Sequence, residues 1–245
     1  MDKFQEKDLS NLYLQDGYQN QKYRRKLNLG SSRLGRAVLQ WITFKSTALL
    51  KRGLDVFTAL AGMIILSPIL LIVAILIKAE SKGPIFFKQE RVGKWGRKFK
   101  MYKFRSMFIN ATQMRDALAS ENEMTGGVIF KMKHDPRITR VGRFIRRSSI
   151  DELPQLINVL KGDMSIVGPR PALQSEVDLY KIEDRYRLLI KPGITCLWQI
   201  NGRSEIPFNE QVKLDLTYME SQNLWQDIKI IIKTIPAVIT GRGAF

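Results

Sequence analysis

Two neighbouring carboxylates, Asp151 and Glu152, are the residues best suited to chemistry in this sequence, and they follow an arginine pair that begins at Arg146. A carboxylate among cations stays ionised at neutral pH, and the same cations attract phosphate groups. Such a carboxylate can attack phosphorus and form an acyl phosphate, which a second acceptor then attacks. A divalent cation would be needed to screen the carboxylate from a diphosphate, and oxygen ligands suit Mg²⁺.

The same carboxylate has a structural alternative as the start of a helix. Ser149 and Glu152 have the spacing of a capping box, but Pro154 would then lie where the helix needs a backbone N–H. With Asp151 at or near the cap, Pro154 falls in the first turn, where proline is tolerated. A helix N-terminus also presents free N–H groups and partial positive charge, which favour phosphate. The spacing alone leaves both roles of Asp151 open.

Two further cationic strings could face the same pocket. Residues 100–106 alternate basic and apolar side chains, as a half-buried strand does, which places Lys103 and Arg105 on one face. Residues 162–171 end in a Pro-Arg-Pro turn that fixes the direction of Arg170, and arginine is suited to bidentate phosphate contact. Taken singly, each string is also explained as surface charge on a basic protein.

Other kinds of site are excluded by the composition. The single histidine, His134, excludes a His-cluster metal site, and its neighbours indicate a turn. The single cysteine, Cys196, excludes an internal disulfide and suits a reducing compartment. The net charge of +17 fits nucleic acid, anionic lipid headgroups or phosphorylated small molecules as partners. The charge makes a nucleic-acid-binding protein one alternative to an enzyme, although no nucleic-acid-binding motif is recognisable. A membrane scaffold without chemistry is the other alternative.

A membrane segment precedes these strings. Residues 56–77 contain no charge, and about 22 residues at 1.5 Å per residue can cover the hydrocarbon core. Pro68 removes the bond to the carbonyl of Ile64, for which Ser67 could supply a partner. Basic residues flank both ends, and such residues favour the cytoplasmic side. We therefore expect a helix that enters, bends and returns rather than a kinked spanning helix, with Asp55 as a polar anchor near the membrane surface.

The chain divides into three predicted parts. Residues 1–47 form a basic tail without a secretory signal, 48–80 the re-entrant membrane helix, and 81–245 a cytosolic catalytic domain with interfacial helices. In the third part we expect a small β-hairpin that pairs residues 85–87 with 98–104. We also expect four helical segments, at residues 110–124, 143–160 (closed by Gly162), 209–219 and 224–239. The last segment is amphipathic, so it lies at the membrane interface or docks on the protein core.

Taken together, the motifs resemble the bacterial sugar transferase family, also called monotopic phosphoglycosyl transferases, from about Lys51 to the C-terminus. Any one motif is weak, but all of them in this order are highly specific. They are Lys51–Asp55, Ser67–Pro68, Phe87–Gly93, Tyr102–Met107, Asp151–Leu156, Gly162–Ser165, Gly168–Pro171, Pro192–Thr195 and Gln199–Arg203.

The resemblance implies an α-rich α+β fold. It would be a monotopic membrane protein of the bacterial inner membrane, with one re-entrant helix-break-helix at Ser67 and Pro68, amphipathic interfacial helices, a small β-hairpin and a catalytic domain facing the cytoplasm. It also implies transfer of a sugar 1-phosphate from a UDP-sugar to polyprenyl phosphate, with release of UMP. Such a step initiates exopolysaccharide, capsule or O-antigen assembly. Anionic membrane lipid is an expected partner and nucleic acid is not.

The resemblance further implies residue roles. Asp151 would attack the β-phosphorus of the UDP-sugar, Glu152 would support it or activate the lipid phosphate, and Mg²⁺ would bridge Asp151 and the diphosphate. The positions that would hold phosphate or nucleotide are Lys103, Arg105, Arg146, Arg170 and Arg203, with Asp163 and Gln199 in supporting roles.

Overall fold

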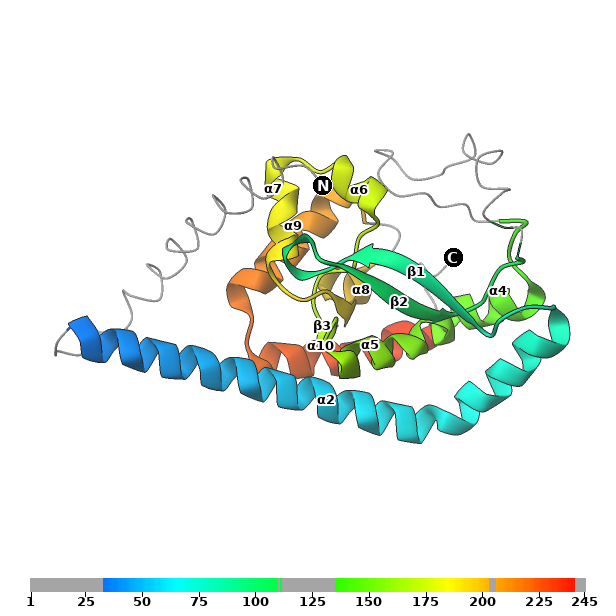
Figure 1. Cartoon of the computed structure of the whole chain (residues 1–245), viewed down its shortest axis with the longest axis horizontal. Helices are drawn as coiled ribbons and strands as arrows, with labels where there is room; N and C mark the ends of the chain where they lie inside the picture. The colour runs from blue at the N-terminus through cyan, green and yellow to red at the C-terminus, as the bar shows by residue number, and fades with distance from the viewer. Residues whose placement is uncertain (1–32, 110, 112–134, 203–205, 241–245) are drawn as a thin grey trace. The chain divides into compact units, whose positions relative to one another are not determined.

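The computed structural model describes the backbone of residues 33–109, 111, 135–202 and 206–240 (Figure 1), and side chains from residue 47 to residue 238 of these ranges. The chain separates into two compact units, residues 1–50 and 51–245. The predicted helix 110–124 (apart from residue 111), His134 and Arg203 lie outside the described residues, as does most of the predicted tail. The strands and the buried core belong to the second unit.

The long helix α2 (Arg33–Glu80) contains the predicted membrane segment. It begins before residue 48, where we expected the membrane segment to start, so residues 33–47 of the predicted tail are helical. Pro68 lies inside it, and the hydroxyl of Ser67 donates to the carbonyl of Ile64 at 2.8 Å, as expected. The ribbon of α2 bends in its C-terminal half (Figure 1), which is the effect of a proline inside a helix.

The two faces of α2 differ in exposure. Ala59, Val73 and Ile77 are buried against the rest of the unit. Large apolar side chains are exposed on the other side, namely Phe57, Leu60, Ile64, Ile65, Ile69, Leu71, Ile72, Ile75 and Leu76. By length and composition this helix could cross a membrane. An exposed apolar surface of this extent is rare on a soluble monomer and is typical of a membrane or protein contact.

The predicted hairpin is confirmed. Strand β1 (Phe86–Val92) pairs antiparallel with β2 (Lys98–Phe104), and the short 3-10 helix η1 (Lys94–Gly96) joins them. The sequence analysis missed a second, parallel pair, β3 (Ser165–Val167) with β4 (Gly193–Thr195). This pair continues into a close backbone contact, because a Cβ on Gly193 would lie 2.1 Å from the backbone nitrogen of Gly168. Glycine is therefore required at position 193, where β4 packs against the start of the Pro-Arg-Pro turn.

The predicted helix 143–160 is broken into three pieces. They are α4 (Arg140–Arg147), the 3-10 helix η3 (Ile150–Gln155) and α5 (Leu156–Lys161), and Gly162 ends α5 in the left-handed region as expected. The break falls at Ser149, whose φ of 55° is left-handed. Ser149 is the N-cap residue of η3 and makes no side-chain cap, so no capping box forms, and Asp151 lies in the first turn, near the cap as expected. A 3-10 turn accommodates Pro154 without requiring a regular α-helix to begin at Asp151.

The remaining elements are helical. The predicted helices 209–219 and 224–239 are confirmed as α9 and α10, and α10 carries both a buried side, with Ile230, and an exposed apolar side, with Trp225, Ile232 and Ile235. The elements are α6 (Gln174–Asp178), α7 (Ile182–Arg185), the 3-10 helix η4 (Tyr186–Leu189), α8 (Leu197–Asn201), α9 (Phe208–Ser221) and α10 (Leu224–Thr240). The fold is thus helix-rich with a small hairpin, as predicted, and it has one further short sheet.

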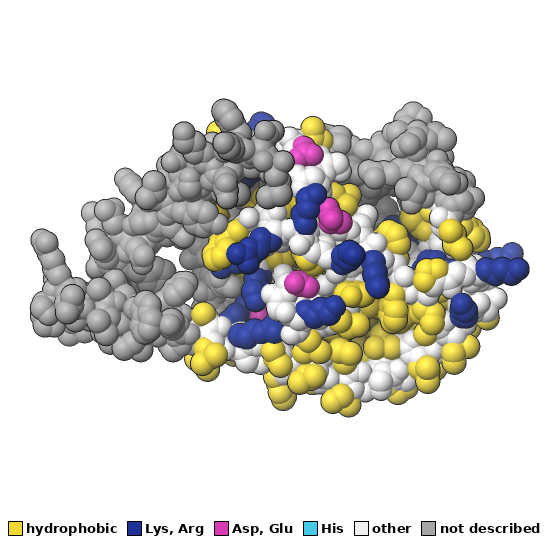
Figure 2. All heavy atoms as spheres, in the orientation of Figure 1, with side chains coloured by type: hydrophobic (Ala, Val, Ile, Leu, Met, Phe, Trp, Pro, Cys, Tyr) yellow, Lys and Arg dark blue, Asp and Glu magenta, His cyan; other side chains and the backbone are white. Residues whose placement is uncertain are grey.

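A core of buried side chains joins α2 to the strands and to α5, α9 and α10. One cluster contains Ala59, Met101, Val159, Tyr218 and Ile230, each from a different one of these elements. Figure 2 shows hydrophobic side chains gathered along one edge of the face drawn, with Lys and Arg beside them. The same helices that build the core on one side therefore expose apolar side chains on the other.

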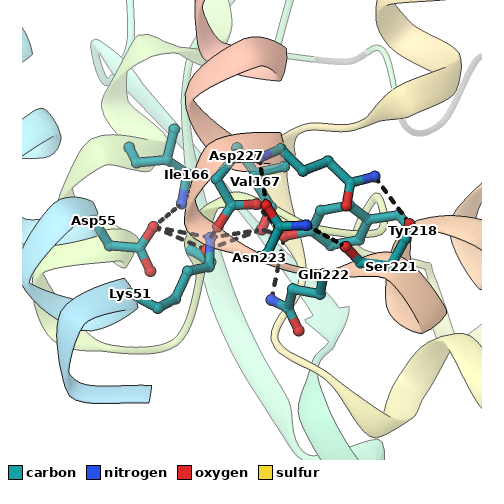
Figure 3. A network of polar contacts seen from close by, with 11 residues as sticks. Lys51, Asp55, Ile166, Val167, Tyr218, Ser221, Gln222, Asn223 and Asp227 are labelled. Atoms are coloured by element: carbon teal, nitrogen blue, oxygen red, sulfur yellow. Dashed lines mark hydrogen bonds and ion pairs between the residues drawn. The ribbon is translucent and has the colours of Figure 1, made fainter. Parts of the chain in front are cut away.

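A buried polar network fixes the region where the predicted membrane segment begins (Figure 3). The ammonium of Lys51 lies 2.9 Å from Asp227 of α10 and 3.3 Å from the carbonyl of Val167. Asp55 is buried and accepts hydrogen bonds from the hydroxyl of Ser165 and the backbone N–H of Ile166, each at 2.9 Å. The expectation that Asp55 is a surface anchor is wrong, because its carboxylate is a structural acceptor that holds α2 against β3.

Candidate active site

The carboxylate pair lies on η3, which packs against β2. The left-handed Ser149 turns the chain between α4 and η3, so that Asp151 and Glu152 follow directly after the reversal. The ammonium of Lys103, on β2, lies 2.5 Å from Oε1 of Glu152. The predicted association of the acidic string with the cationic strand is therefore present in the structure.

Asp151 is buried, and burial raises the pKa of its carboxyl group to about 6. This value is the balance of burial, which is the largest cause, and the charge of Glu152, which both raise the pKa, against the positive charges of Lys103 and Arg146, which lower it. Apart from its own backbone N–H, no group among the described residues gives a hydrogen bond to this carboxylate. Asp151 is thus mostly ionised at neutral pH, more basic than an exposed aspartate, and uncommitted to a partner.

Glu152 has the opposite balance. Burial alone would raise the pKa of its carboxyl group, but the charge and hydrogen bond of Lys103 and the charges of Arg170 and Arg91 lower it below its usual range. The two adjacent carboxyl groups thus differ. Lys103 holds Glu152 as an anion, whereas the pKa of Asp151 is raised to about 6. Such a separation of pKa values is a frequent mark of a functional pair.

A narrow cavity opens to solvent beside Glu152. Its charged and amide side chains are Arg91, Lys103, Glu152, Gln155, Arg170 and Gln199. Of the predicted site residues, Lys103, Glu152, Arg170 and Gln199 are therefore brought together. With three cations against one carboxylate, the cavity suits a ligand that carries phosphate groups.

Arg170 is free to bind such a ligand. Within the ranges that the structure describes, its guanidinium makes no hydrogen bond or ion pair, although it lines the cavity. Arg91 was missed as a site residue, although it lies in the motif Phe87–Gly93. It is buried, donates to the carbonyl of Pro171 at 3.0 Å, and so holds the turn that carries Arg170. Only the folded structure brings the motif of Arg91 next to this turn.

Four of the predicted residues do not line the cavity, namely Asp151, Arg146, Arg105 and Asp163. Asp151 precedes Glu152 on η3, and Arg146 is near enough to lower the pKa of Asp151. Arg105 is buried and donates to the carbonyls of Ile77, Ser81 and Lys82 at 3.2, 2.7 and 2.8 Å, which caps the C-terminal end of α2. Asp163 lies in the turn after α5, where it accepts from the amide of Asn158 at 3.3 Å.

The carboxylate pair fits a magnesium ion that is shared with a substrate. Mg²⁺ in phosphate-handling sites is usually bound by one or two carboxylates, with waters and substrate phosphates completing its ligands. No group of three or more His, Cys, Asp and Glu side chains occurs among the described residues, so a cage made entirely of such side chains is absent there. The uncommitted carboxylate of Asp151 is the donor that such a shared ion requires.

The sequence profile of the family described as "Bacterial sugar transferase" matches residues 46–241. The chain belongs to this family. The match includes the carboxylate pair, the Lys103 strand, the Pro-Arg-Pro turn and the whole of α10. The resemblance stated from the motifs is therefore confirmed.

Three relatives show how the chain compares with named proteins. It is 49% identical over 195 residues to the galactosyl transferase CpsE of Streptococcus agalactiae serotype III, covering 79% of this chain and 43% of the relative. It is 41% identical over 204 residues to the undecaprenyl-phosphate galactose phosphotransferase of Salmonella typhimurium, covering 82% and 43%. It is 40% identical over 198 residues to the exopolysaccharide production protein ExoY of Sinorhizobium fredii, covering 80% and 88%. The chain thus spans less than half the length of the first two and most of the third.

Proposed function

We propose that this protein transfers a sugar 1-phosphate from a UDP-sugar to polyprenyl phosphate and releases UMP. The observation that carries the proposal is the pair Asp151 and Glu152 beside Lys103, with Glu152 held by the lysine and Asp151 uncommitted. The names of the relatives support the substrate class, since one is an undecaprenyl-phosphate galactose phosphotransferase. A scaffold or a nucleic-acid-binding protein has no use for such a pair.

In the first step, a carboxylate oxygen of Asp151 attacks the β-phosphorus of the UDP-sugar. The bond from this phosphorus to the bridging oxygen breaks, and UMP leaves with the electron pair. The sugar phosphate remains on Asp151 as an acyl phosphate. The raised pKa of Asp151 makes it a stronger nucleophile than an exposed aspartate, while leaving it mostly ionised at pH 7. Arg170 and Lys103 stabilise the negative charge of the diphosphate.

In the second step, an oxygen of the polyprenyl phosphate attacks the same phosphorus. The acyl phosphate bond breaks, Asp151 leaves as a carboxylate, and the product is a polyprenyl diphosphate sugar. Glu152 faces the cavity with its charge balanced by Lys103. As an anion held by Lys103, it positions that lysine beside the lipid phosphate. A bound Mg²⁺, held by Asp151 and the diphosphate oxygens, would supply the Lewis acidity that screens the two anions.

A re-entrant course for α2 is supported by the attachment of both ends of its apolar segment to the same folded unit. Near the N-terminal side, Arg52 donates to the carbonyls of Val159 and Leu160 at 2.6 and 2.9 Å. At the C-terminal end, the carboxylate of Glu80 accepts from the backbone N–H groups of Arg140 and Val141 at 2.7 and 3.1 Å. A straight spanning helix would separate these ends by the thickness of the bilayer. With both ends on the cytoplasmic side, the exposed apolar faces of α2 and α10 enter the inner membrane together.

This arrangement brings the two substrates together. The lipid acceptor carries its phosphate at the level of the headgroups, because its tail stays in the hydrocarbon. The nucleotide donor arrives from the cytosol. A catalytic unit held at the interface by a re-entrant and an amphipathic helix meets both. The excess of basic residues favours the anionic cytoplasmic leaflet.

The transfer is tested by UMP release from the full chain in detergent with undecaprenyl phosphate, Mg²⁺ and a panel of UDP-galactose, UDP-glucose and UDP-N-acetylgalactosamine. Asp151→Asn is compared with Asp178→Asn, which changes an exposed carboxylate outside the cavity. We expect loss of UMP release by at least a thousandfold in Asp151→Asn alone. Without the acceptor, the intact mass of the wild type should increase by one phosphosugar. Turnover retained in Asp151→Asn rejects the nucleophile.

The topology is tested separately with single cysteines in a Cys196→Ser background. Gly53→Cys and Lys82→Cys flank the apolar segment at exposed positions. A membrane-impermeant maleimide should label both from the cytoplasmic side of inverted vesicles and neither from the periplasmic side of spheroplasts. Labelling of the two positions from opposite sides would show a spanning helix.

A further inference from the structure

The hairpin of β1 and β2 turns one of its faces toward the cavity described above. Side chains alternate between the two faces of a strand, and side chains that are paired across neighbouring strands share a face. Arg91, Met101 and Lys103 line the cavity, so they mark this face. Arg91 donates a hydrogen bond to the side chain of Gln89 at 2.7 Å, as expected for two residues on the same side of β1. Phe87 is the next residue of β1 on this face, and it is paired directly with Lys103.

The side chain of Phe87 is 44% exposed, although it is paired with a lysine whose ammonium lies in a partly buried ion pair. It belongs to none of the core clusters that the described residues form. Its neighbour Phe86 points to the other face and stacks on Phe104, with ring centroids 5.4 Å apart, and Phe104 is buried against α2. The ring of Phe87 therefore leaves an apolar surface open to solvent beside Lys103.

This end of the hairpin is also the end that is attached to α2. Two residues before Phe87, the carbonyl of Ile85 accepts from the backbone N–H of Arg105 at 2.8 Å. Ile85 packs on the cluster that contains Ile77 of α2, and the guanidinium of Arg105 binds the last carbonyls of the same helix. Figure 1 shows the start of β1 next to the C-terminal end of α2. Phe87 thus lies at the end of the cavity-facing surface that is nearest to the apolar segment of α2.

We propose that Phe87 contacts the first isoprene units of polyprenyl phosphate and so holds the acceptor phosphate beside Lys103. The inference rests on the proposed function and assigns the apolar part of the same acceptor. Directly paired residues of a hairpin have Cβ atoms about 4.5–5.5 Å apart. An ammonium and an aromatic ring at this spacing match an anionic phosphate that is joined to its isoprenoid through a single oxygen atom.

Two other ligands match this surface less well. In a phospholipid, a glycerol backbone and ester groups separate the phosphate from the acyl chains, so the apolar part begins farther from the charge than these two side chains are from each other. The hexose of the donor carries hydroxyl groups, which are costly to remove from water without a hydrogen-bonding partner. An isoprenoid on the ring removes apolar surface from water on both sides of the contact.

The test separates the two steps of the transfer. Formation of the phosphosugar enzyme is followed by single-turnover UMP release without acceptor. Its consumption is followed in mixed micelles in which only the mole fraction of undecaprenyl phosphate varies. Phe87→Thr removes the ring and keeps a strand-forming residue, whereas Phe87→Leu keeps an apolar side chain. Trp95→Ala is the matched control, because Trp95 is exposed to a similar extent (42%) at the other end of the same hairpin.

We expect Phe87→Thr to raise the mole fraction of acceptor that gives half the maximal rate by roughly three- to tenfold. This is the effect of leaving about half of a phenylalanine side chain in water instead of covering it. The rate of the first step and the KM for the UDP-sugar should not change. Phe87→Leu should restore most of the acceptor affinity, and Trp95→Ala should behave as the wild type does.

An unchanged dependence on the acceptor in Phe87→Thr would overturn the proposal. A higher KM for the UDP-sugar with the acceptor unaffected would assign the ring to the donor and would also reject it. So would weaker sedimentation of Phe87→Thr with phosphatidylglycerol vesicles that contain no acceptor, because Phe87 would then be a general membrane contact. If the wild type forms no phosphosugar enzyme, the proposed function itself fails. If melting temperatures show that Phe87→Thr is unfolded, Phe87→Ala decides.

Discussion

The ammonium of Lys51 lies 2.9 Å from Oδ2 of Asp227, which joins the start of the apolar segment of α2 to α10. Asp227 also accepts a hydrogen bond from the hydroxyl of Tyr218 at 2.6 Å, and the oxygen of this hydroxyl lies 3.1 Å from the carbonyl oxygen of Val167. The two helices with exposed apolar faces are therefore coupled through one buried ion pair, together with the strand β3 that leads to the Pro-Arg-Pro turn.

Lys51→Met should strongly destabilise the protein. The variant leaves Asp227 and Asp55 buried without the cation that balances them, and breaking a buried ion pair from one side typically costs about 3–5 kcal/mol. Denaturation in detergent measures the effect. The control is Lys98→Met, which removes an exposed ion pair with Glu90 and should change stability by less than about 1 kcal/mol. A Lys51→Met protein as stable as the control would contradict the coupling.

Asp151→Asn should stabilise the protein at neutral pH while abolishing transfer. The folded-state pKa of Asp151 is raised from 3.8 to about 6, so the folded protein holds this proton more tightly than the unfolded chain does. The wild type therefore loses stability as the pH rises from about 4 to about 6, by up to about 3 kcal/mol. Asparagine does not titrate, so the advantage of the variant in melting temperature should be larger at pH 7.5 than at pH 4. If the melting-temperature advantage of Asp151→Asn became smaller as the pH rises, the pKa of Asp151 would be lowered in the folded protein rather than raised.

The pH dependence of the first step should follow Asp151. Single-turnover UMP release should decline below about pH 6, as the nucleophile becomes protonated. Lys103 lowers the pKa of Asp151, so Lys103→Met should slow the step and move the acidic limb to higher pH. Lys161→Met, which removes a lysine that bonds Tyr102 outside the cavity, should leave the limb in place. If the acidic limb of the pH profile does not move in Lys103→Met, it does not report the titration of Asp151.

Replacing Arg105 and replacing Arg170 should have different effects, the first on stability and the second on ligand binding. Arg105→Met removes the cap on the last carbonyls of α2, so it should lower the melting temperature. Arg170→Met removes a cation without internal bonds in the described parts of the chain, so it should weaken UDP-sugar binding at least tenfold with little change in melting temperature. Binding to the Asp151→Asn background and thermal unfolding, measured for both variants, distinguish the two. If Arg105→Met weakened UDP-sugar binding without lowering the melting temperature, Arg105 would be a phosphate-binding residue after all.

Features governed by neighbouring residues could be predicted from the sequence. The bond from Ser67 to Ile64 follows from the place of Pro68, since a proline frees the carbonyl of the preceding turn. The hairpin follows from alternating side chains around glycines, and the carboxylate pair beside Lys103 follows from the motifs. Each of these depends on a rule of spacing within a few residues or on motifs read together.

Features governed by distant residues could not be predicted. Arg105 and Lys103 alternate along one string, yet the end of α2 takes the guanidinium of Arg105 while Lys103 meets Glu152. Asp55 lies at the edge of an apolar run, which indicates a surface position, but β3 offers it two buried donors. The strands β3 and β4 are too short for a periodic signal. In each case the deciding partner comes from another part of the chain.

The attachment of both ends of the apolar segment of α2 has a consequence for the lipid. In the re-entrant course proposed above, a segment tied down at Arg52 and Glu80 would displace acyl chains from a single leaflet. Its length would then not have to match the hydrophobic thickness of the bilayer, as the length of a spanning helix must. Catalysis by such a protein would respond to the headgroups and packing of the leaflet it occupies, and would be insensitive to acyl chain length in vesicles of otherwise constant composition.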